Sequence, residues 1–348
     1  MPKARIRLLT AIILIALFLA GAWAQAGLRV SFLDLGQAEG TLLQGPDFTI
    51  LIDTGDQGRD DLLPKLRDLG VEKIDLLVLT HPHADHLGQA CQVLDTFPVK
   101  EVWMCGSVHT TALFEKVLDT LEASSAGYYQ PRRGEVIHFG DLSLEILNPE
   151  EPLKTSLHEN CLVLRAVYGR VAFLFTADIE QKTEKEILAA GLPLRAQILQ
   201  VAHHGSGTSS NVEFLIAVDP DLAVYSAGKG NIFGHPHQEV VERFLGLGIP
   251  LYGTDSLGTI TVFTDGNSYW GDFSLTEQPL VLNRVDLNSA GWEELQKIVH
   301  IGPARAEEII KMRAASPFRS LDDLKRIPGL GPVRIEEIKK QGIAYVGG

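Results

Sequence analysis

Between about residue 28 and residue 270, short apolar and β-branched runs alternate with stretches of helical periodicity. Some runs, such as Ile74–Thr80, are almost continuously apolar, which is typical of strands covered on both faces. The predicted strands are Leu28–Leu35, Thr41–Gln44, Thr49–Ile52, Ile74–Thr80, Glu101–Met104, Leu142–Leu147, Cys161–Val167, Val171–Thr176, Ala196–Ala202, Leu222–Ser226 and Thr259–Thr264. The predicted helices are Asp60–Leu69, Thr111–Ala123, Ile179–Ala190, Val212–Val218 and Gln238–Leu247. This alternation indicates sheets covered by helices.

The pattern changes near residue 280. Residues 274–280 have no clear period and include a proline, so they are predicted to be a linker. After residue 285 the pattern predicts helices only, broken at Gly-Pro pairs, over Trp292–Ile298, Glu307–Ala314, Leu324–Ile327 and Ile335–Lys340. The Gly-Pro hairpins recur with a period near 29 residues, from Gly302 to Gly331. We therefore expect a first domain over residues 25–273 and a second over 281–348.

The N-terminus has the three parts of an export signal. Lys3, Arg5 and Arg7 precede the apolar run Leu8–Ala20, and Ala22-Trp23-Ala24 offers small residues to a signal peptidase. We predict a signal peptide over residues 1–24 and an extracytoplasmic protein, secreted or held in the cell envelope. The alternative is an uncut anchor, although the run is short for a span of about 20 residues. No later segment is long and apolar enough to cross a bilayer, so no membrane span is expected after cleavage.

Composition narrows the class of protein. Of 348 residues 45% are hydrophobic, which excludes wholesale disorder, and three cysteines are too few for a disulfide scaffold, although Cys91 and Cys105 could pair. The net charge of −13 argues against a nucleic-acid partner. The charge is unevenly divided, however: residues 25–280 hold 17 basic and 35 acidic residues, whereas 281–348 hold 11 and 9, a net of +2. A nucleic-acid contact therefore remains open for the second domain.

The clearest chemical signal is His81-Pro82-His83-Ala84-Asp85-His86, which directly follows an apolar strand. Imidazole and carboxylate groups are the ligands of zinc and related divalent ions. Further polar groups follow other predicted strands, and loops at one end of a sheet can converge. These groups are Asp53, Asp178, His203, His204, Ser206, Ser226, Asn231 and the pair His235 and His237.

The run His81–His86 resembles the HxHxDH signature of the metallo-β-lactamase superfamily. More narrowly, residues 28–270 are similar to the hydrolase domain of ComEC-type DNA-uptake proteins. The matching stretches are Phe32–Gln37, Leu51–Gly55, Leu79–His86, Ala202–Ser206, Phe233–Pro236 and Thr254-Asp255. The chain departs from this pattern at Ala38-Glu39, where the family often has Gly-Asp. The resemblance implies an α+β fold: an αββα sandwich, followed here by a small all-α domain.

The resemblance also implies a metal site for two divalent ions, zinc or manganese. His81, His83 and His158 would hold one ion, with His158 open because this subgroup tends to carry Asn at that position. Asp85, His86 and His204 would hold the other, and Asp178 would bridge both. Asp53 and His203 would orient these ligands from behind, although which member of the His203-His204 doublet is the ligand stays open.

Substrate roles follow from the same resemblance. Ser206, Ser226 and Asn231 would donate to substrate phosphate, while Asp85, His235 and His237 are the candidate catalytic residues beside the metals. Either His235 or His237 would protonate the leaving group. The other interpretation of His235-Pro236-His237 is a rigid turn before the helix Gln238–Leu247.

Residues 281–346 resemble the tandem helix-hairpin-helix domain of ComEA-type DNA receptors. Gly-rich hairpins before helices let backbone N–H groups approach a DNA phosphate without recognising the base sequence. The expected DNA-binding residues are Gly302, Arg305, Gly329, Gly331, Arg334, Lys339 and Lys340. His300 stands where the first hairpin usually has Gly. The alternative is a protein-interaction or packing module.

Together these patterns predict an exported metal-dependent phosphodiesterase or nuclease acting on DNA, with a second domain that binds the DNA backbone. A partnership with DNA-uptake machinery is a further expectation. Two alternatives remain: a hydrolase of a small lactam, lactone or ester, and a non-catalytic extracellular DNA receptor.

Overall fold

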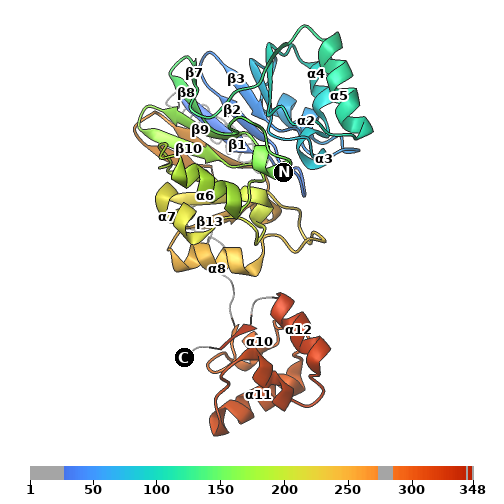
Figure 1. Cartoon of the computed structure of the whole chain (residues 1–348). Coiled ribbons are helices and arrows are strands. Elements are labelled where there is room, and N and C mark those ends of the chain that lie inside the picture. Colours follow the sequence, from blue (N-terminus) through green and yellow to red (C-terminus); the bar gives the residue numbers. More distant parts are fainter. Residues whose placement is uncertain (1–26, 273–284, 342–343, 347–348) are drawn as a thin grey trace, which may run out of the picture. The chain divides into compact units, whose positions relative to one another are not determined.

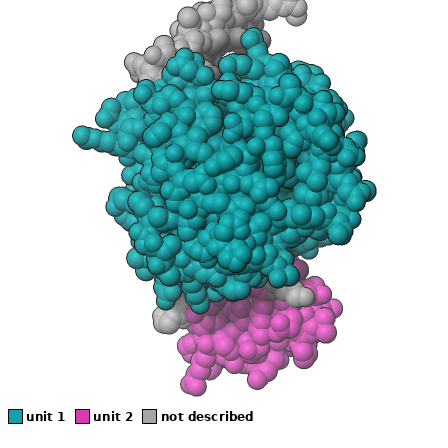
Figure 2. Space-filling view, turned by 45° about the horizontal axis from the view of Figure 1, so that its top comes forward, with its two compact units in different colours: residues 1–279 teal, residues 280–348 magenta. Residues whose placement is uncertain are grey.

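The computed structural model describes residues 27–272, 285–341 and 344–346. The predicted signal peptide and the predicted linker lie outside these residues. The chain forms two compact units, residues 1–279 and 280–348 (Figure 2). Of the described helices, none has the length and apolar character needed to cross a membrane.

The first unit contains two large sheets (Figure 1). One has eight strands, in the order β15 (Tyr269–Gly271), β14 (Ile260–Thr264), β1 (Leu28–Phe32), β2 (Thr41–Gln44), β3 (Thr49–Ile52), β4 (Leu76–Leu79), β5 (Glu101–Met104) and β6 (Gly127–Tyr129). The other has seven, in the order β13 (Leu251–Gly253), β12 (Leu222–Tyr225), β11 (Ile198–Gln200), β10 (Val171–Phe175), β9 (Val163–Tyr168), β8 (Leu142–Asn148) and β7 (Val136–Phe139).

The main core lies between the sheets, because alternate side chains of both point into it. Val30 and Phe32 of β1 join Phe173 and Phe175 of β10 in one buried cluster. The Phe32 and Phe175 rings lie 6.3 Å apart.

Helices cover the outer faces of both sheets. On the first sheet, Leu51 and Leu77 pack with the buried side chains of α2 (Leu62–Asp68), α4 (Ala90–Thr96) and α5 (Ala112–Ala123). The helices α6 (Gln181–Ala189), α7 (Val212–Val218) and α8 (Gln238–Gly246) lie along the second sheet (Figure 1). The predicted αββα sandwich is therefore confirmed.

Sheet topology places the polar residues that follow the strands. β3 and β4 are parallel neighbours, and β10, β11 and β12 are parallel neighbours in the other sheet. Because parallel strands end at the same edge, Asp53 and His81 follow one pair of strands, and Asp178 and His204 follow the other. The short helix α3 (Ala84–Leu87) then turns Asp85 and His86 toward the same edge.

Several elements differ from the predictions. The strands β6, β7, β13 and β15 and the helices α3, α4 and α9 (Thr254–Leu257) were not predicted. β13 and β15 are three residues long, and β6 is exposed at every position, so none of them carries an alternating pattern. The sequence left open whether Cys91 and Cys105 pair; in the structure they do not, since the three cysteines are buried free thiols.

The second unit has its own hydrophobic core. Its elements are α10 (Trp292–Leu295), α11 (Pro303–Ala315), a 3-10 helix η3 (Leu321–Arg326) and α12 (Pro332–Gln341). Two helices begin earlier than predicted, at Pro303 and Pro332, because proline fits the first helical turn, where its missing N–H costs nothing. The prediction of helices only is also corrected, since β16 (Val285–Asp286) pairs in parallel with β17 (Ala344–Tyr345).

His300 occupies a backbone conformation that favours glycine, with φ of +64°. A left-handed conformation costs an L-residue about 1–2 kcal/mol. The His300 imidazole forms a hydrogen bond with Glu337. Because this contact is exposed to solvent, it adds little to the stability of the second unit. Replacing His300 with Gly should therefore stabilise residues 280–348 by about 0.5–1 kcal/mol and raise the melting temperature by a few degrees.

Circular-dichroism melts of the second unit test this expectation. His300→Ala is the matched control, because alanine removes the Glu337 contact and keeps the strained backbone. It should not stabilise the unit. A lower melting temperature for His300→Gly than for the parent would contradict the explanation.

Candidate metal centre

Several residues near the site have strained backbone. Asp53, Ala177, His203 and His204 all have φ between +47° and +60°. Non-glycine residues in this region cost of order 1–3 kcal/mol each and persist only where the surrounding structure holds them. The strain therefore marks the strand ends where these side chains converge.

A first group of ligand atoms comes from His81, His83, His158 and Asp178. His81 Nε2 lies 2.9 Å from His83 Nδ1, and His158 Nε2 lies 3.3 Å from the same His83 atom. His81 Nε2 also lies 3.8 Å from Asp178 Oδ2. The structure thus brings His158 to the other residues proposed for the first ion.

A second group consists of Asp85, His86, His204 and again Asp178. Asp178 Oδ1 lies 3.2 Å from His86 Nε2 and 3.8 Å from His204 Nε2. His204 Nε2 is 3.4 Å from Asp85 Oδ2. Asp178 therefore belongs to both groups, and each of its carboxylate oxygens faces one of them.

The donor atoms fit divalent ions. His86 Nε2, Asp178 Oδ1 and His204 Nε2 are buried, yet within the described part of the chain they make no hydrogen bond. A buried polar atom without a partner costs about 1–3 kcal/mol, so three of them around one point need an explanation. Histidine nitrogen and carboxylate oxygen together suit zinc or manganese.

Burial and neighbouring charges set the protonation states of these ligands. Burial alone would raise the pKa of Asp178, but His86 and His204 outweigh burial and hold that pKa well below its usual value. Burial, followed by the charge of His86, lowers the pKa of His81 well below its usual value. Asp178 is therefore ionised and His81 neutral at neutral pH, as metal ligands must be.

Other side chains orient these ligands from behind. Asp53 is fully buried, accepts hydrogen bonds from the backbone N–H and hydroxyl of Thr80, and lies 2.7 Å from His86 Nδ1. His204 Nδ1 lies 2.9 Å from the Ser226 carbonyl oxygen and can only donate to it. Both imidazoles therefore direct Nε2 at the second group. Although burial opposes it, Asp178 raises the pKa of His86 well above its usual value and that of His204 to about 9, so each Nε2 releases a proton when it binds a metal.

Replacing Asp53 with Asn should lower affinity at the second group by about 10–100-fold. The amide can still accept from Thr80, but it has lost the charge and the second acceptor that hold the Nδ1–H of His86. Competition against a chromogenic chelator measures the effect. The exposed Asp119→Asn on α5 is the matched control, and equal affinities for the two variants would contradict this role for Asp53.

A third cluster lies beside the first group. His158 Nδ1 is 3.7 Å from Glu180 Oε1, and His203 Nδ1 is 4.0 Å from the same oxygen. His203 Nε2 is 3.6 Å from Asp178 Oδ2. His203 thus lies near the first group with Glu180 behind it. Sequence reasoning missed Glu180, although it stands only two residues after Asp178.

Glu39 was also missed as a functional residue. It lies in the departure from the family pattern and is almost fully buried, and burial raises its pKa to about 6. It accepts hydrogen bonds from the Gln200 amide and the Ser226 hydroxyl. Its Oε2 lies 4.0 Å from His204 Nδ1, so the carboxyl supports the second group from behind.

The side chains expected to bind phosphate have other partners. The Ser226 hydroxyl donates to Glu39 and its residue is 1% exposed. The Ser206 hydroxyl is buried against Thr208. The Asn231 amide donates to the carbonyls of Gly228 and His235. Each group thus already has a partner within the protein, and its role in binding phosphate stays a prediction.

His235 and His237 differ in their surroundings. His237 Nδ1 accepts from the Gly207 N–H, and its Nε2 donates to the Phe233 carbonyl, so His237 fixes the turn before α8. The His235 ring lies 6.1 Å from the His203 ring and 6.3 Å from the His204 ring, beside the second group. Burial, then His237 and His204, lowers the pKa of His235 to about 4. His235 is therefore the better placed of the two, and it is neutral at neutral pH.

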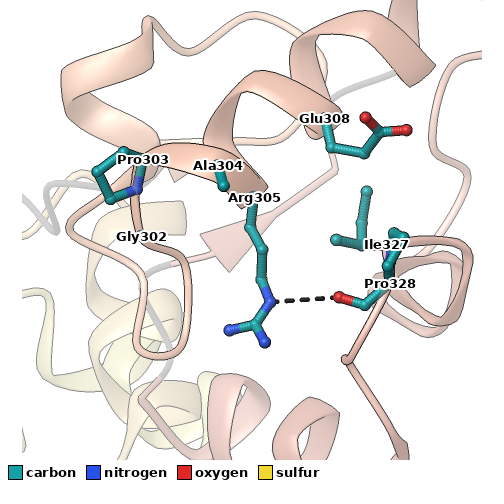
Figure 3. A pocket seen from close by; sticks show the side chains of 7 residues that line it. All are labelled: Gly302, Pro303, Ala304, Arg305, Glu308, Ile327 and Pro328. Carbon is teal, nitrogen blue, oxygen red and sulfur yellow. Dashed lines mark hydrogen bonds between the residues drawn. The ribbon is translucent and has the colours of Figure 1, made fainter.

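In the second unit, a pocket of about 490 Å³ opens beside the N-terminal turn of α11 (Figure 3). Gly302, Pro303, Ala304, Arg305, Glu308, Ile327 and Pro328 line it. Arg305 donates to the carbonyls of His300 and Pro328 and so ties the two hairpins together. Its guanidinium has further N–H donors that these bonds do not use.

The remaining residues expected to bind DNA lie around the second hairpin. Gly329 has φ of +78°, and its carbonyl accepts from Arg334. Gly331 directly precedes α12. Lys339 pairs with Asp322 and Glu336, whereas the side chain of Lys340 lies outside the described residues. The arginines thus brace the hairpin backbones in addition to supplying charge.

Comparison with known proteins agrees with this architecture. Residues 33–229 match the profile of the metallo-beta-lactamase superfamily, and residues 282–341 match that of the helix-hairpin-helix motif. The chain therefore belongs to the metallo-beta-lactamase superfamily, whose fold carries hydrolases, and it has a helix-hairpin-helix region at its C-terminal end.

Among the individual proteins that resemble this chain are competence and recombination proteins. ComE operon protein 3 of Bacillus subtilis (strain 168) is 31% identical over 67% of this chain and 32% of that protein. Competence protein ComA of Neisseria gonorrhoeae is 31% identical over 66% of this chain and 31% of that protein. Recombination protein 2 of Haemophilus influenzae is 30% identical over 62% of this chain and 26% of that protein. The resemblance to ComEC-type proteins is thus confirmed, and the chain spans about a third of the length of these relatives.

Proposed function

We propose that this protein is an exported metal-dependent phosphodiesterase that cleaves DNA, with residues 25–273 as the catalytic domain and 281–348 as a DNA-binding module. The observation that carries the proposal is Asp178, whose two oxygens face two separate groups of ligands. A shared carboxylate between two ions is the arrangement of two-metal phosphoryl-transfer sites. The competence-protein relatives and the helix-hairpin-helix motif support DNA as the substrate.

The residues divide the work of hydrolysis. His81, His83, His158 and Asp178 would hold one ion, and Asp85, His86, His204 and Asp178 the other. Zinc or manganese held there would lower the pKa of a water and would polarise a phosphoryl oxygen. Asp53, Ser226 and Glu39 keep the imidazoles in orientation. His235 stands beside this site as a donor to the leaving oxygen.

The second module would bind the phosphate backbone of the DNA. Gly302 and Gly331 precede two helices whose N-terminal ends favour phosphate. The acidic first domain would discourage non-specific contact, so DNA would meet the basic module first. Export by the N-terminal signal would place this chemistry outside the cytoplasm, where DNA uptake or DNA breakdown takes place.

A substrate panel separates this proposal from the superfamily's small-molecule hydrolases. The Mn²⁺- or Zn²⁺-loaded protein is offered bis(p-nitrophenyl) phosphate, plasmid DNA and the lactam nitrocefin. We expect turnover of both phosphodiesters and none of nitrocefin. Nitrocefin turnover without phosphodiester cleavage would favour a lactam or ester hydrolase. No turnover at all by a fully loaded protein would favour a DNA receptor without catalysis.

A further inference from the structure

The loop between β12 and α8 is held in a single shape next to the second ligand group. The Asn231 side chain donates to the Gly228 and His235 carbonyls, and its oxygen accepts from the His235 N–H. His237 fixes the far end of the loop through Gly207 and Phe233. The position of His235 is therefore set by the fold before any substrate arrives.

Gln37 connects this loop to the first sheet. Its Oε1 accepts the Gly228 N–H at 3.0 Å, and its Nε2 lies 3.2 Å from His235 Nδ1. The two backbones approach closely here: a Cβ added to Gly228 would lie only 3.0 Å from the backbone nitrogen of Gln37. One amide thus bonds the start of the loop and the imidazole near its end.

The network fixes the position of the proton on His235. A backbone N–H can only donate, so Gly228 requires the oxygen of the Gln37 amide to face it. The NH₂ of the same amide then faces His235 and donates to Nδ1. Nδ1 must accept, so the single proton of the neutral imidazole resides on Nε2. That Nε2 makes no hydrogen bond within the described part of the chain.

We propose that Gln37 is a positioning residue: its amide holds His235 in the Nε2–H tautomer, so that this N–H donates a hydrogen bond to the leaving oxygen of the phosphodiester. The inference rests on the proposed function for its substrate and on the amide geometry for its tautomer. It also changes the role assigned to His235, from an acid that gives up a proton to a neutral hydrogen-bond donor. A donor of this kind stabilises negative charge that develops in the transition state, and the departed alkoxide then takes its proton from solvent water.

The leaving group provides a kinetic test that a structural role would not satisfy. An alkoxide, as in DNA, needs help to leave, whereas p-nitrophenolate needs little. In the Mn²⁺-loaded full chain, Gln37→Ala and His235→Ala should each lower kcat on a dinucleotide by about 10²-fold or more. On bis(p-nitrophenyl) phosphate kcat should change less than about threefold. The double variant should lose no more than either single variant, because both changes remove one interaction.

The tautomer itself can be observed by NMR in the Zn²⁺-loaded protein with ¹⁵N-labelled histidine. The His235 signals are assigned by their loss in His235→Ala, and they should show a proton on Nε2 and a bare Nδ1. Gln37→Glu, which offers His235 only an acceptor, should move the proton to Nδ1 and lose dinucleotide cleavage as Gln37→Ala does. Gln92→Ala, an exposed glutamine on α4, is the matched control and should change nothing.

Two results would overturn the proposal. One is an equal fall in kcat on both substrates, which would show that Gln37 only stabilises the loop. The other is a proton on Nδ1 of His235 in the parent protein. The spectra do not depend on turnover, so failure of the proposed phosphodiesterase function would be recognised separately, as a parent protein that cleaves neither substrate.

Discussion

Replacing Asp178 with Ala is expected to lower phosphodiester hydrolysis by on the order of 10³-fold or more, and to reduce bound metal to at most one ion per chain. Polarisation by metals supplies several kcal/mol of transition-state stabilisation, and each 1.36 kcal/mol is tenfold in rate. Asp178 is the residue that both ligand groups share. Its loss would therefore damage both positions, whereas loss of His83 would damage only the first.

The measurement pairs metal analysis by mass spectrometry with kcat on bis(p-nitrophenyl) phosphate. Asp119→Ala is the control, since Asp119 lies exposed on α5. Circular dichroism shows whether the variant is folded. A folded Asp178→Ala protein that keeps two ions and normal activity would be incompatible with the shared carboxylate.

Deleting residues 281–348 is expected to weaken duplex-DNA binding by at least about tenfold at low salt, while kcat on the chromogenic diester stays within about twofold. Each unit has its own core, so the first unit should fold without the second. The deleted segment carries a net charge of +2, whereas residues 25–280 carry −18. The remaining protein therefore has lost its phosphate-binding hairpins and keeps a surface that repels DNA.

Salt dependence gives the second half of this prediction. Because cations released from the DNA drive binding to phosphates, the full chain should lose affinity as salt rises, and the truncated chain should show a smaller slope. Fluorescence anisotropy with a labelled duplex measures both constants. Equal affinity with and without residues 281–348 would instead favour a protein-interaction or packing role for the second module.

The sequence predicted the parts of the site that local pattern carries. His81–His86 follows a strand whose apolar run is plain, so its position at a sheet edge could be predicted. By resemblance, the order of Asp53, Asp178 and His204 after other apolar strands placed two further ligands, Asp178 and His204, and the orienting residue Asp53. These predictions depend on strand ends, and strand ends are set by short-range patterns.

The residues that the sequence did not assign act across long distances in the chain. Gln37 meets Gly228 and His235, and Glu39 meets Ser226, through contacts between the two sheets that no local pattern encodes. For the same reason the sequence did not predict that the Ser226 hydroxyl donates to Glu39. The early starts of α11 and α12 have a local cause, because Gly-Pro was taken as loop where proline begins the helix.

The central claim is metal-dependent cleavage of DNA at this site, and a nuclease assay tests it most directly. Plasmid and single-stranded DNA are incubated with the parent protein and with His83→Ala, each with Mn²⁺, with Zn²⁺ or with a chelator. The expected result is cleavage by the parent protein that requires the metal and is lost in His83→Ala. No cleavage by the metal-loaded parent protein, or equal cleavage by the parent and His83→Ala, would contradict the claim.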